Sequence, residues 1–113
     1  MRCAMNKKIY ELHADVCKTM SNPKRLEIIN LLRDGEKSVD ELTLDMKVRK
    51  ANMSQHLAVM RAKKIVETRR EGLKIYYHIA NPKVVKACDI MREVLLEQLS
   101  DGQKFAEKVK KRI

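Results

Sequence analysis

The residues with the most recognisable chemistry lie between positions 49 and 56, where polar and basic side chains outnumber apolar ones. Asn and Gln can bond adenine through two hydrogen bonds, Arg and Lys can bond guanine, and Ser can bond either base. This stretch predicts contacts with the base edges of duplex DNA; the alternative is the solvated face of an ordinary surface helix. The candidate base-reading residues are Arg49, Lys50, Asn52, Ser54, Gln55 and His56.

A second basic group follows about twenty residues later. Arg69 and Arg70 precede Glu71-Gly72 and Lys74 follows them, so these cations flank a turn. A basic β-hairpin suits the phosphate backbone or the minor groove, where Arg gains from the negative potential. Arg61 lies between the two groups, and we expect it to contact phosphate. The turn alone is also consistent with a solvated surface, but a hairpin directly after the base-reading stretch favours DNA binding by both.

Composition agrees with a polyanionic partner. The 113 residues carry a formal net charge of +10 and are 44% hydrophobic and 35% charged, which is typical of one globular domain. Nucleic acid is the leading candidate partner, with an anionic membrane surface or an acidic protein as alternatives. No apolar run approaches the roughly 20 residues of a membrane span, and no signal peptide is evident. We therefore expect a cytoplasmic protein without a membrane partner.

The elements that position these groups follow from apolar spacing and capping residues. Helices are predicted over residues 9–20, from Pro23 to about Arg33, from Ser38 to about 46, and over about 50–63. Asn22 before Pro23 is a candidate N-cap, and Ser38 with Glu41 has the spacing of a capping box. Asp34-Gly35 is expected to end the second helix, because glycine tolerates a left-handed conformation.

The pattern then changes to strand formers. Residues 65–70 and 73–80 flank Glu71-Gly72 and predict a β-hairpin, and Asn81-Pro82 opens a helix that runs to about Leu99. A basic tail follows, which we expect to be helical. Two short helices joined by a tight turn and followed by a hairpin describe a winged helix-turn-helix. The predicted fold is mainly α with a β-hairpin wing.

Three stretches resemble the ArsR/SmtB-type repressors. Residues 21–28 are similar to the "ANPxRLxIL" opening of that family's second helix, residues 53–57 to its "VSQHL" recognition-helix core, and residues 65–77 to its "LVxxRREGxxxYY" wing. The resemblance implies a homodimer formed by the first and last helices, bound to a palindromic operator in two successive major grooves. It divides a single domain, 1–113, into a DNA-binding core at 21–80 and dimerisation helices at 1–20 and 81–113, the last with the basic tail.

The sequence departs from the family in two respects. Arg49 stands where family members often have Ser at the start of the recognition helix, so the operator sequence does not transfer. The family's usual metal-ligand positions also carry the wrong residues, and a divalent-metal sensor is not expected. These positions are Ser38, Asp40, Asn81, Lys83, Val94 and Glu97.

Three cysteines, Cys3, Cys17 and Cys88, leave the sensed signal open. Cys17 and Cys88 fall on the apolar faces of the two expected dimer helices, where cysteine is commonly a small buried hydrophobe. A second interpretation is a thiol sensor in which these two cysteines are oxidised. A third is a thiophilic metal ion such as arsenite bound with Cys3, for which His13 is a further candidate ligand. No other cofactor is expected.

The function predicted from these residues is transcriptional regulation. The chain is expected to be a sequence-specific, homodimeric DNA-binding repressor, released by an effector or by thiol modification at the dimer helices. The alternatives are an effector-independent regulator, a non-specific architectural DNA-binding protein, and a winged helix that binds an acidic protein. The chain shows no Ser-His-Asp or Cys-His arrangement of usable spacing and no glycine-rich phosphate loop, so an enzyme is not expected.

Overall fold

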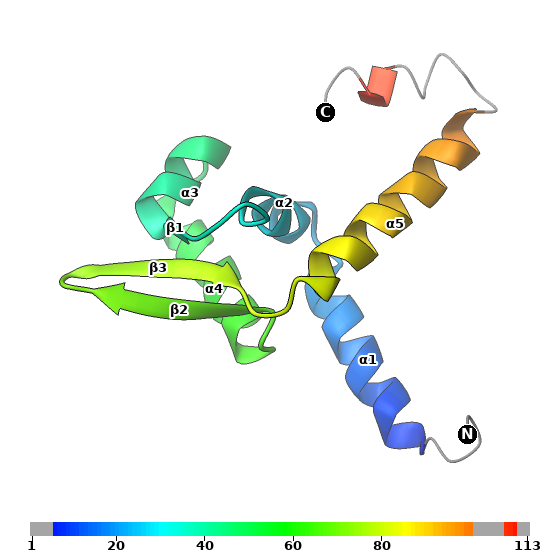
Figure 1. The fold of residues 1–113 in the computed structure, drawn as a ribbon, viewed down its shortest axis with the longest axis horizontal. Coiled ribbons are helices and arrows are strands. Elements are labelled where there is room, and N and C mark those ends of the chain that lie inside the picture. Colours follow the sequence, from blue (N-terminus) through cyan, green and yellow to red (C-terminus); the bar gives the residue numbers. More distant parts are fainter. Residues whose placement is uncertain (1–5, 101–107, 111–113) are drawn as a thin grey trace. The chain divides into compact units, whose positions relative to one another are not determined.

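The computed structural model describes residues 6–100 and 108–110, and the chain divides into two compact units, residues 1–82 and 83–113. The described part is a mainly helical winged helix-turn-helix with a β-hairpin wing, as predicted (Figure 1). Its helices are α1 (Lys7–Met20), α2 (Pro23–Leu31), α3 (Val39–Met46), α4 (Lys50–Ala62) and α5 (Lys83–Leu99). Its strands are β1 (Lys37–Ser38), β2 (Val66–Glu71) and β3 (Lys74–Ile79).

The start of α2 is fixed by the residues that the sequence indicated. The Asn22 side chain accepts hydrogen bonds from the backbone N–H groups of Lys24 and Arg25, and Pro23 occupies the first turn. The end of α2 was predicted wrongly. The helix stops at Leu31 rather than at about Arg33, because the chain leaves helical geometry at Leu32. Gly35 is therefore not the helix cap; it lies beyond the turn with φ +150°.

Helix α3 begins with the predicted capping box. The Ser38 hydroxyl accepts from the Glu41 N–H at 3.1 Å, and the Glu41 carboxylate accepts from the Ser38 N–H at 2.9 Å. At its other end, Lys47 adopts a left-handed conformation with φ 56° and ψ 43°. This residue makes the tight turn between α3 and α4, the two helices of the helix-turn-helix.

The sheet contains a strand that the sequence did not indicate. Residues 37–38 pair antiparallel with β3, which also pairs with β2, so the strand order is β1-β3-β2. A two-residue strand carries too little period-two pattern to be recognised. The β2–β3 hairpin closes over Gly72 and Leu73, and Gly72 has φ +62° while Leu73 is not among the residues with positive φ. Positive φ at only the first central position is the pattern of a type II′ turn.

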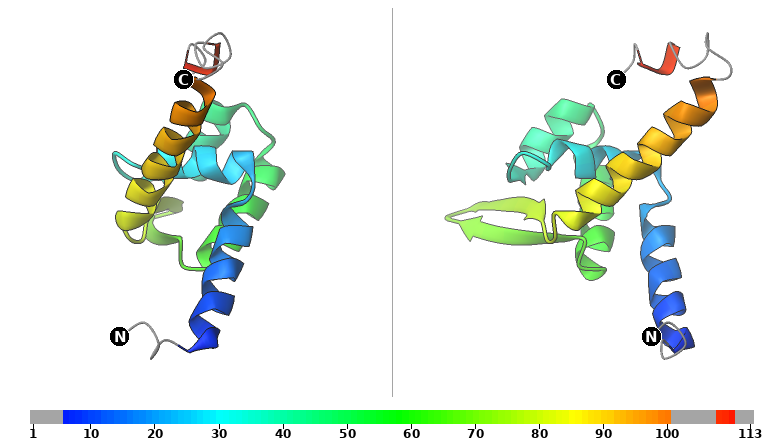
Figure 2. Two further views of the ribbon diagram at one scale, coloured as in Figure 1. Left: turned by 90° about the vertical axis from the view of Figure 1, so that its right-hand side faces the viewer. Right: turned by 45° about the vertical axis from the view of Figure 1, so that its right-hand side comes forward.

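The core of the first unit lies between the helices and the base of the wing. Helix α4 contacts α1, α2, α3 and β2, and the hairpin projects beyond these helices (Figure 2). The fully buried large side chains are Ile28, Ile29, Leu42, Met53, Leu57, Met60 and Val66. Because α4 contributes three of these side chains, its orientation is set by the core, and its remaining face is left for solvent or a ligand.

The elements described in the second unit are α5 and a short helical stretch at residues 108–110. Of the predicted basic tail, Lys108 and Lys110 are described and are exposed, and Lys104, Phe105, Lys111 and Arg112 lie outside the described residues. None of the described helices has both the length and the apolar character needed to cross a membrane.

Candidate nucleic-acid interface

Helix α4 has two chemically distinct faces. Met53, Leu57 and Met60 are fully buried on one side. Asn52 and Gln55 are exposed, as are Ser54 and Ala58. Asn52, Ser54 and Gln55, three of the predicted base-reading residues, therefore project from a helix whose other face is anchored in the core, which is the arrangement needed to present polar side chains to a DNA groove.

The first turn of α4 carries two of the predicted basic contacts. Arg49 is the N-cap residue, it is exposed, and its side chain makes no capping hydrogen bond. The ammonium group of Lys50 lies 3.0 Å from a carboxylate oxygen of Asp40 in α3. Both side chains are more than two-thirds exposed, and exposed ion pairs of this kind contribute about 0–1 kcal/mol. A phosphate can therefore replace Asp40 as the partner of Lys50 at little cost.

The predicted DNA contact His56 is engaged inside the protein. Its Nδ1 accepts a hydrogen bond from Nε of Arg25 at 3.1 Å, and its side chain is only partly exposed. Burial lowers the pKa of His56, and the positive charges of Arg25 and Lys24 lower it further. The neutral imidazole is thus the favoured form, and the geometry gives His56 a role in holding α4 in place.

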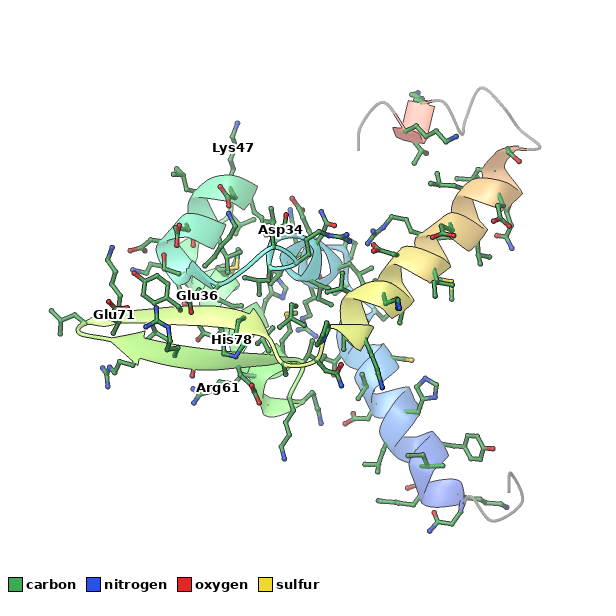
Figure 3. All side chains as sticks on the ribbon, viewed as in Figure 1. Asp34, Glu36, Lys47, Arg61, Glu71 and His78 are labelled. Carbon is green, nitrogen blue, oxygen red and sulfur yellow. The ribbon has the colours of Figure 1, made fainter. Side chains whose placement is uncertain are left out.

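Arg69, another predicted DNA contact, is held by two carboxylates. Its Nε lies 3.0 Å from Glu36 Oε2, one terminal nitrogen lies 2.7 Å from Glu36 Oε1, and the other lies 2.7 Å from Glu71. The guanidinium also stacks over the Tyr76 ring at 5.0 Å. The hydrogen bonds to Glu36 and then Glu71 raise the pKa of Arg69, and the same bond lowers the pKa of Glu36. Arg69 thereby ties the wing to the loop before β1. Figure 3 labels its two carboxylate partners, Glu36 and Glu71.

Arg70 and Lys74 occupy the outer part of the wing. Both are exposed, and strand alternation places Arg70 on the opposite face of β2 from Arg69. Between them stands Leu73, which is 98% exposed. The wing therefore presents two cations and one apolar side chain at its end.

The remaining predicted positions are dispersed. Arg61 is exposed in the last turn of α4, beside β2 (Figure 3), and the neighbouring Lys63 pairs with Asp15 of α1 at 2.6 Å. His78 lies on β3 with Nε2 3.4 Å from a carboxylate oxygen of Glu67. Arg61 thus stands apart from the first turn of α4, where Lys50 and Asn52 lie.

In the part of the chain that is described, neither the cysteines nor the family's metal-ligand positions come together as a metal site. Cys17 is exposed on α1 and Cys88 is buried on α5, whereas Cys3 lies outside the described residues. Ser38 caps α3 and Asp40 pairs with Lys50. The described residues contain no group of three His, Cys, Asp or Glu side chains that could hold a metal ion.

Sequence reasoning missed several residues of this surface. Arg25 and Glu36 hold the two elements that carry the predicted contacts, but each acts on a residue more than thirty positions away, and no local pattern reveals such a pair. The exposed Leu73 could have been recognised from the sequence. An apolar residue between Gly72 and Lys74 occupies a turn position where polar residues are usual.

Comparison with known proteins shows the family to which this chain belongs. The arsR family of bacterial regulatory proteins matches residues 22–68. The HTH-type transcriptional regulator Rv0081 of Mycobacterium tuberculosis is 37% identical over 94 residues, 82% of each chain. The biofilm growth-associated repressor of Agrobacterium fabrum is 38% identical over 88 residues, 78% of this chain and 74% of that protein. The transcriptional activator HlyU of Vibrio cholerae is 32% identical over 77 residues, 68% of this chain and 71% of that protein.

Solved structures agree. The crystal structure of M. tuberculosis Rv0081 superposes with a TM-score of 0.76 at 36% identity, covering 85% of this chain and 97% of that one. The homodimeric winged helix-turn-helix DNA-binding domain of Mb0332 from Mycobacterium bovis gives 0.74 at 30% identity, covering 81% of this chain and 85% of that one. The chain belongs to the arsR family of bacterial regulatory proteins, and it is a DNA-binding, winged helix-turn-helix transcriptional regulator rather than an enzyme.

Proposed function

We propose that this regulator is a sequence-specific homodimeric repressor that reads a palindromic operator. The observation that carries the proposal is the exposed polar face of α4, with Asn52, Ser54 and Gln55 opposite the buried Met53 and Leu57. In a dimer, two such helices would enter successive major grooves about 34–36 Å apart. Repression rather than activation is favoured by the resemblance to the biofilm growth-associated repressor, although an activator also stands among the relatives.

Exposed apolar side chains on the terminal helices support the dimer. Helix α1 carries Ile9, Tyr10 and Leu12, which are 44–61% exposed. Helix α5 carries an apolar set of its own with 40–60% exposure: Ile90, Met91, Val94 and Leu95. Large exposed apolar side chains gathered on one element mark a surface that another protein covers. The Mb0332 relative is described as homodimeric, which favours a second copy of this chain as that protein.

Release from DNA is proposed to begin at the same helices, through an effector or through the thiols. Cys17 is exposed on α1 and is open to an oxidant, and Cys88 is buried on α5, where an added oxygen or sulfur atom would disturb packing. Either change would alter the angle between the two α4 helices and weaken binding in both grooves at once.

The test compares affinity for the DNA upstream of the protein's own gene with affinity for a scrambled duplex at fixed salt, with reductant and then with oxidant. Selective binding that oxidant abolishes, and that Cys17→Ser or Cys88→Ser protects, supports the thiol-switched repressor. Selective binding that oxidant does not change supports sequence-specific DNA binding and shows that the cysteines do not control it. Equal affinity for both duplexes overturns sequence specificity and leaves an architectural DNA-binding protein.

A further inference from the structure

A hollow of about 210 Å³ lies between the wing and the start of the helix-turn-helix. Its walls come from both elements that the DNA-binding function uses. Leu73, Lys74 and Ile75 line it from the wing, and Val39, Asp40 and Lys50 line it from α3 and α4. The hollow is therefore lined by both the wing and the helix-turn-helix.

The lining combines two kinds of surface. Leu73 and Ile75 are both apolar, yet Leu73 is 98% exposed and Ile75 is 40% exposed. Lys50 and Lys74 bring two positive charges to the same hollow from separate elements. A ligand that fits must offer an anionic group next to an apolar one.

A DNA strand has this composition, because each phosphate is joined to a deoxyribose ring. The major and minor grooves are separated by a single phosphodiester strand. A protein that places α4 in the major groove and its wing in the adjacent minor groove must straddle that strand. The hollow lies between these two elements, which is where the strand would pass.

We infer that the hollow is a clamp for the phosphodiester strand between the two grooves, an inference that rests on the proposed sequence-specific binding. Lys50 and Lys74 hold one phosphate from opposite sides. Leu73, Ile75 and Val39 pack against the neighbouring deoxyribose, so the contact has an apolar component that salt does not screen. The clamp fixes the register of α4 in the major groove without reading a base.

Asp40 gives the clamp a built-in counter-charge. In the free protein its carboxylate accepts from Lys50 at 3.0 Å, so the anion site is partly filled by the chain itself. When a phosphate enters, Lys50 exchanges Asp40 for it, and the displaced carboxylate repels the DNA backbone. Asp40 therefore lowers affinity for every duplex to the same extent.

The two lysines are tested by the salt dependence of DNA affinity. Lys50→Gln and Lys74→Gln are measured singly and together on one fixed duplex, with the exposed Lys86 of α5 changed to Gln as the matched control. Neutralising one phosphate contributes about 0.9 to the slope of log affinity against log salt. The double variant should flatten the slope by about 0.9 per protomer. A flattening of about 1.8, as two separate phosphates would give, or one no greater than that of Lys86→Gln, overturns the clamp.

The apolar wall and the counter-charge have their own measurements. Leu73→Ser should weaken binding several-fold with an unchanged salt slope, and Asp40→Asn should strengthen binding to selected and scrambled duplexes alike by a similar factor. Unchanged affinity of Leu73→Ser overturns the deoxyribose contact, and unchanged or weaker binding by Asp40→Asn overturns the counter-charge. Circular dichroism and thermal unfolding confirm that each variant is folded.

A neutral methylphosphonate, moved one position at a time through a duplex selected by the wild-type protein, locates the phosphate. At one position per half-site, wild type and the double lysine variant should bind equally well. Separate positions for Lys50 and Lys74 contradict a shared phosphate. If the wild type binds every duplex equally, sequence specificity fails, yet the salt slopes on a fixed duplex still decide whether the clamp exists.

Discussion

Arg25 donates a hydrogen bond from Nε to Nδ1 of His56 at 3.1 Å, and the same guanidinium donates to the carbonyl of Thr19 at 3.0 Å. One side chain in α2 thus joins the end of α1 to the middle of α4, the second helix of the helix-turn-helix. Because half-buried polar groups are costly to leave without partners, this contact restricts how α4 can rotate.

The His56 contact predicts a dependence of stability on pH. The folded-state pKa of His56 is lowered by burial and by neighbouring positive charges, so folding favours the neutral form. The stability that this contributes is fully present above the unfolded pKa of about 6.5. It is lost as the pH falls through the lowered folded pKa, because the unfolded chain binds the proton more readily.

Urea denaturation between pH 7.5 and pH 5 measures this effect. The free energy of unfolding should fall with pH in the wild type and fall less in His56→Gln. Replacing the exposed His13 by Gln is the matched control and should keep the wild-type profile. Identical profiles for wild type and His56→Gln would contradict the assignment.

The Glu36–Arg69 contact predicts that loss of the Glu36 negative charge weakens DNA binding, although charge alone would strengthen it. Glu36→Gln removes a negative charge, which by itself would favour DNA. The same change loosens the wing, because Arg69 loses the carboxylate it binds at 2.7–3.2 Å. We expect weaker DNA binding by Glu36→Gln, measured by fluorescence anisotropy. Glu67→Gln on the same strand as Arg69 is the control for lost charge. Binding by Glu36→Gln as strong as that by Glu67→Gln would contradict a role of Glu36 in holding the wing.

Lys47 predicts a stabilising substitution. It holds φ 56° at the end of α3, where a side chain is strained, and its own side chain extends away from the helices (Figure 3). Lys47→Gly should raise the free energy of unfolding by about 0.5–1 kcal/mol. Lys47→Ala keeps the strained conformation and should give no gain, and equal effects of the two in thermal unfolding would argue against backbone strain.

The burial of Leu57 predicts how much stability is lost when a cavity is made beneath the exposed polar face of α4. Its side chain is fully buried, so Leu57→Ala should lower the free energy of unfolding by about 2–5 kcal/mol. Leu44 of α3 is 79% exposed, and Leu44→Ala should change the free energy of unfolding by less than about 0.5 kcal/mol. Chemical denaturation compares the two, and similar losses would mean that Leu44 is also covered, for instance by a partner.

Gln55 predicts a loss of discrimination rather than of general affinity. If its amide bonds a base edge, Gln55→Ala should reduce the preference for the selected duplex by about 1–3 kcal/mol and leave the salt slope unchanged. Gln98→Ala on α5 is the matched control. An unchanged ratio between selected and scrambled duplexes in competition binding would remove Gln55 from base reading.

Local features of this chain were accessible from the sequence, because their physical causes are local. The Asn22 cap, the Ser38–Glu41 capping box and the turn at Gly72 each depend on residues within a few positions of one another. The apolar spacing of Met53 and Leu57 likewise indicated which face of α4 is buried. The helices, the wing and the polar face of α4 are therefore predictable from local sequence.

Tertiary structure decided which of the polar candidates also have partners within the protein. His56 and Arg69 have residue types suited to bases and phosphates, but each meets a partner more than thirty positions away. The strand at residues 37–38 and the hollow beneath Leu73 likewise exist only because distant segments come together. Periodicity reports the environment of a helix or strand, whereas the partner of a side chain depends on how the elements pack, which no local pattern encodes.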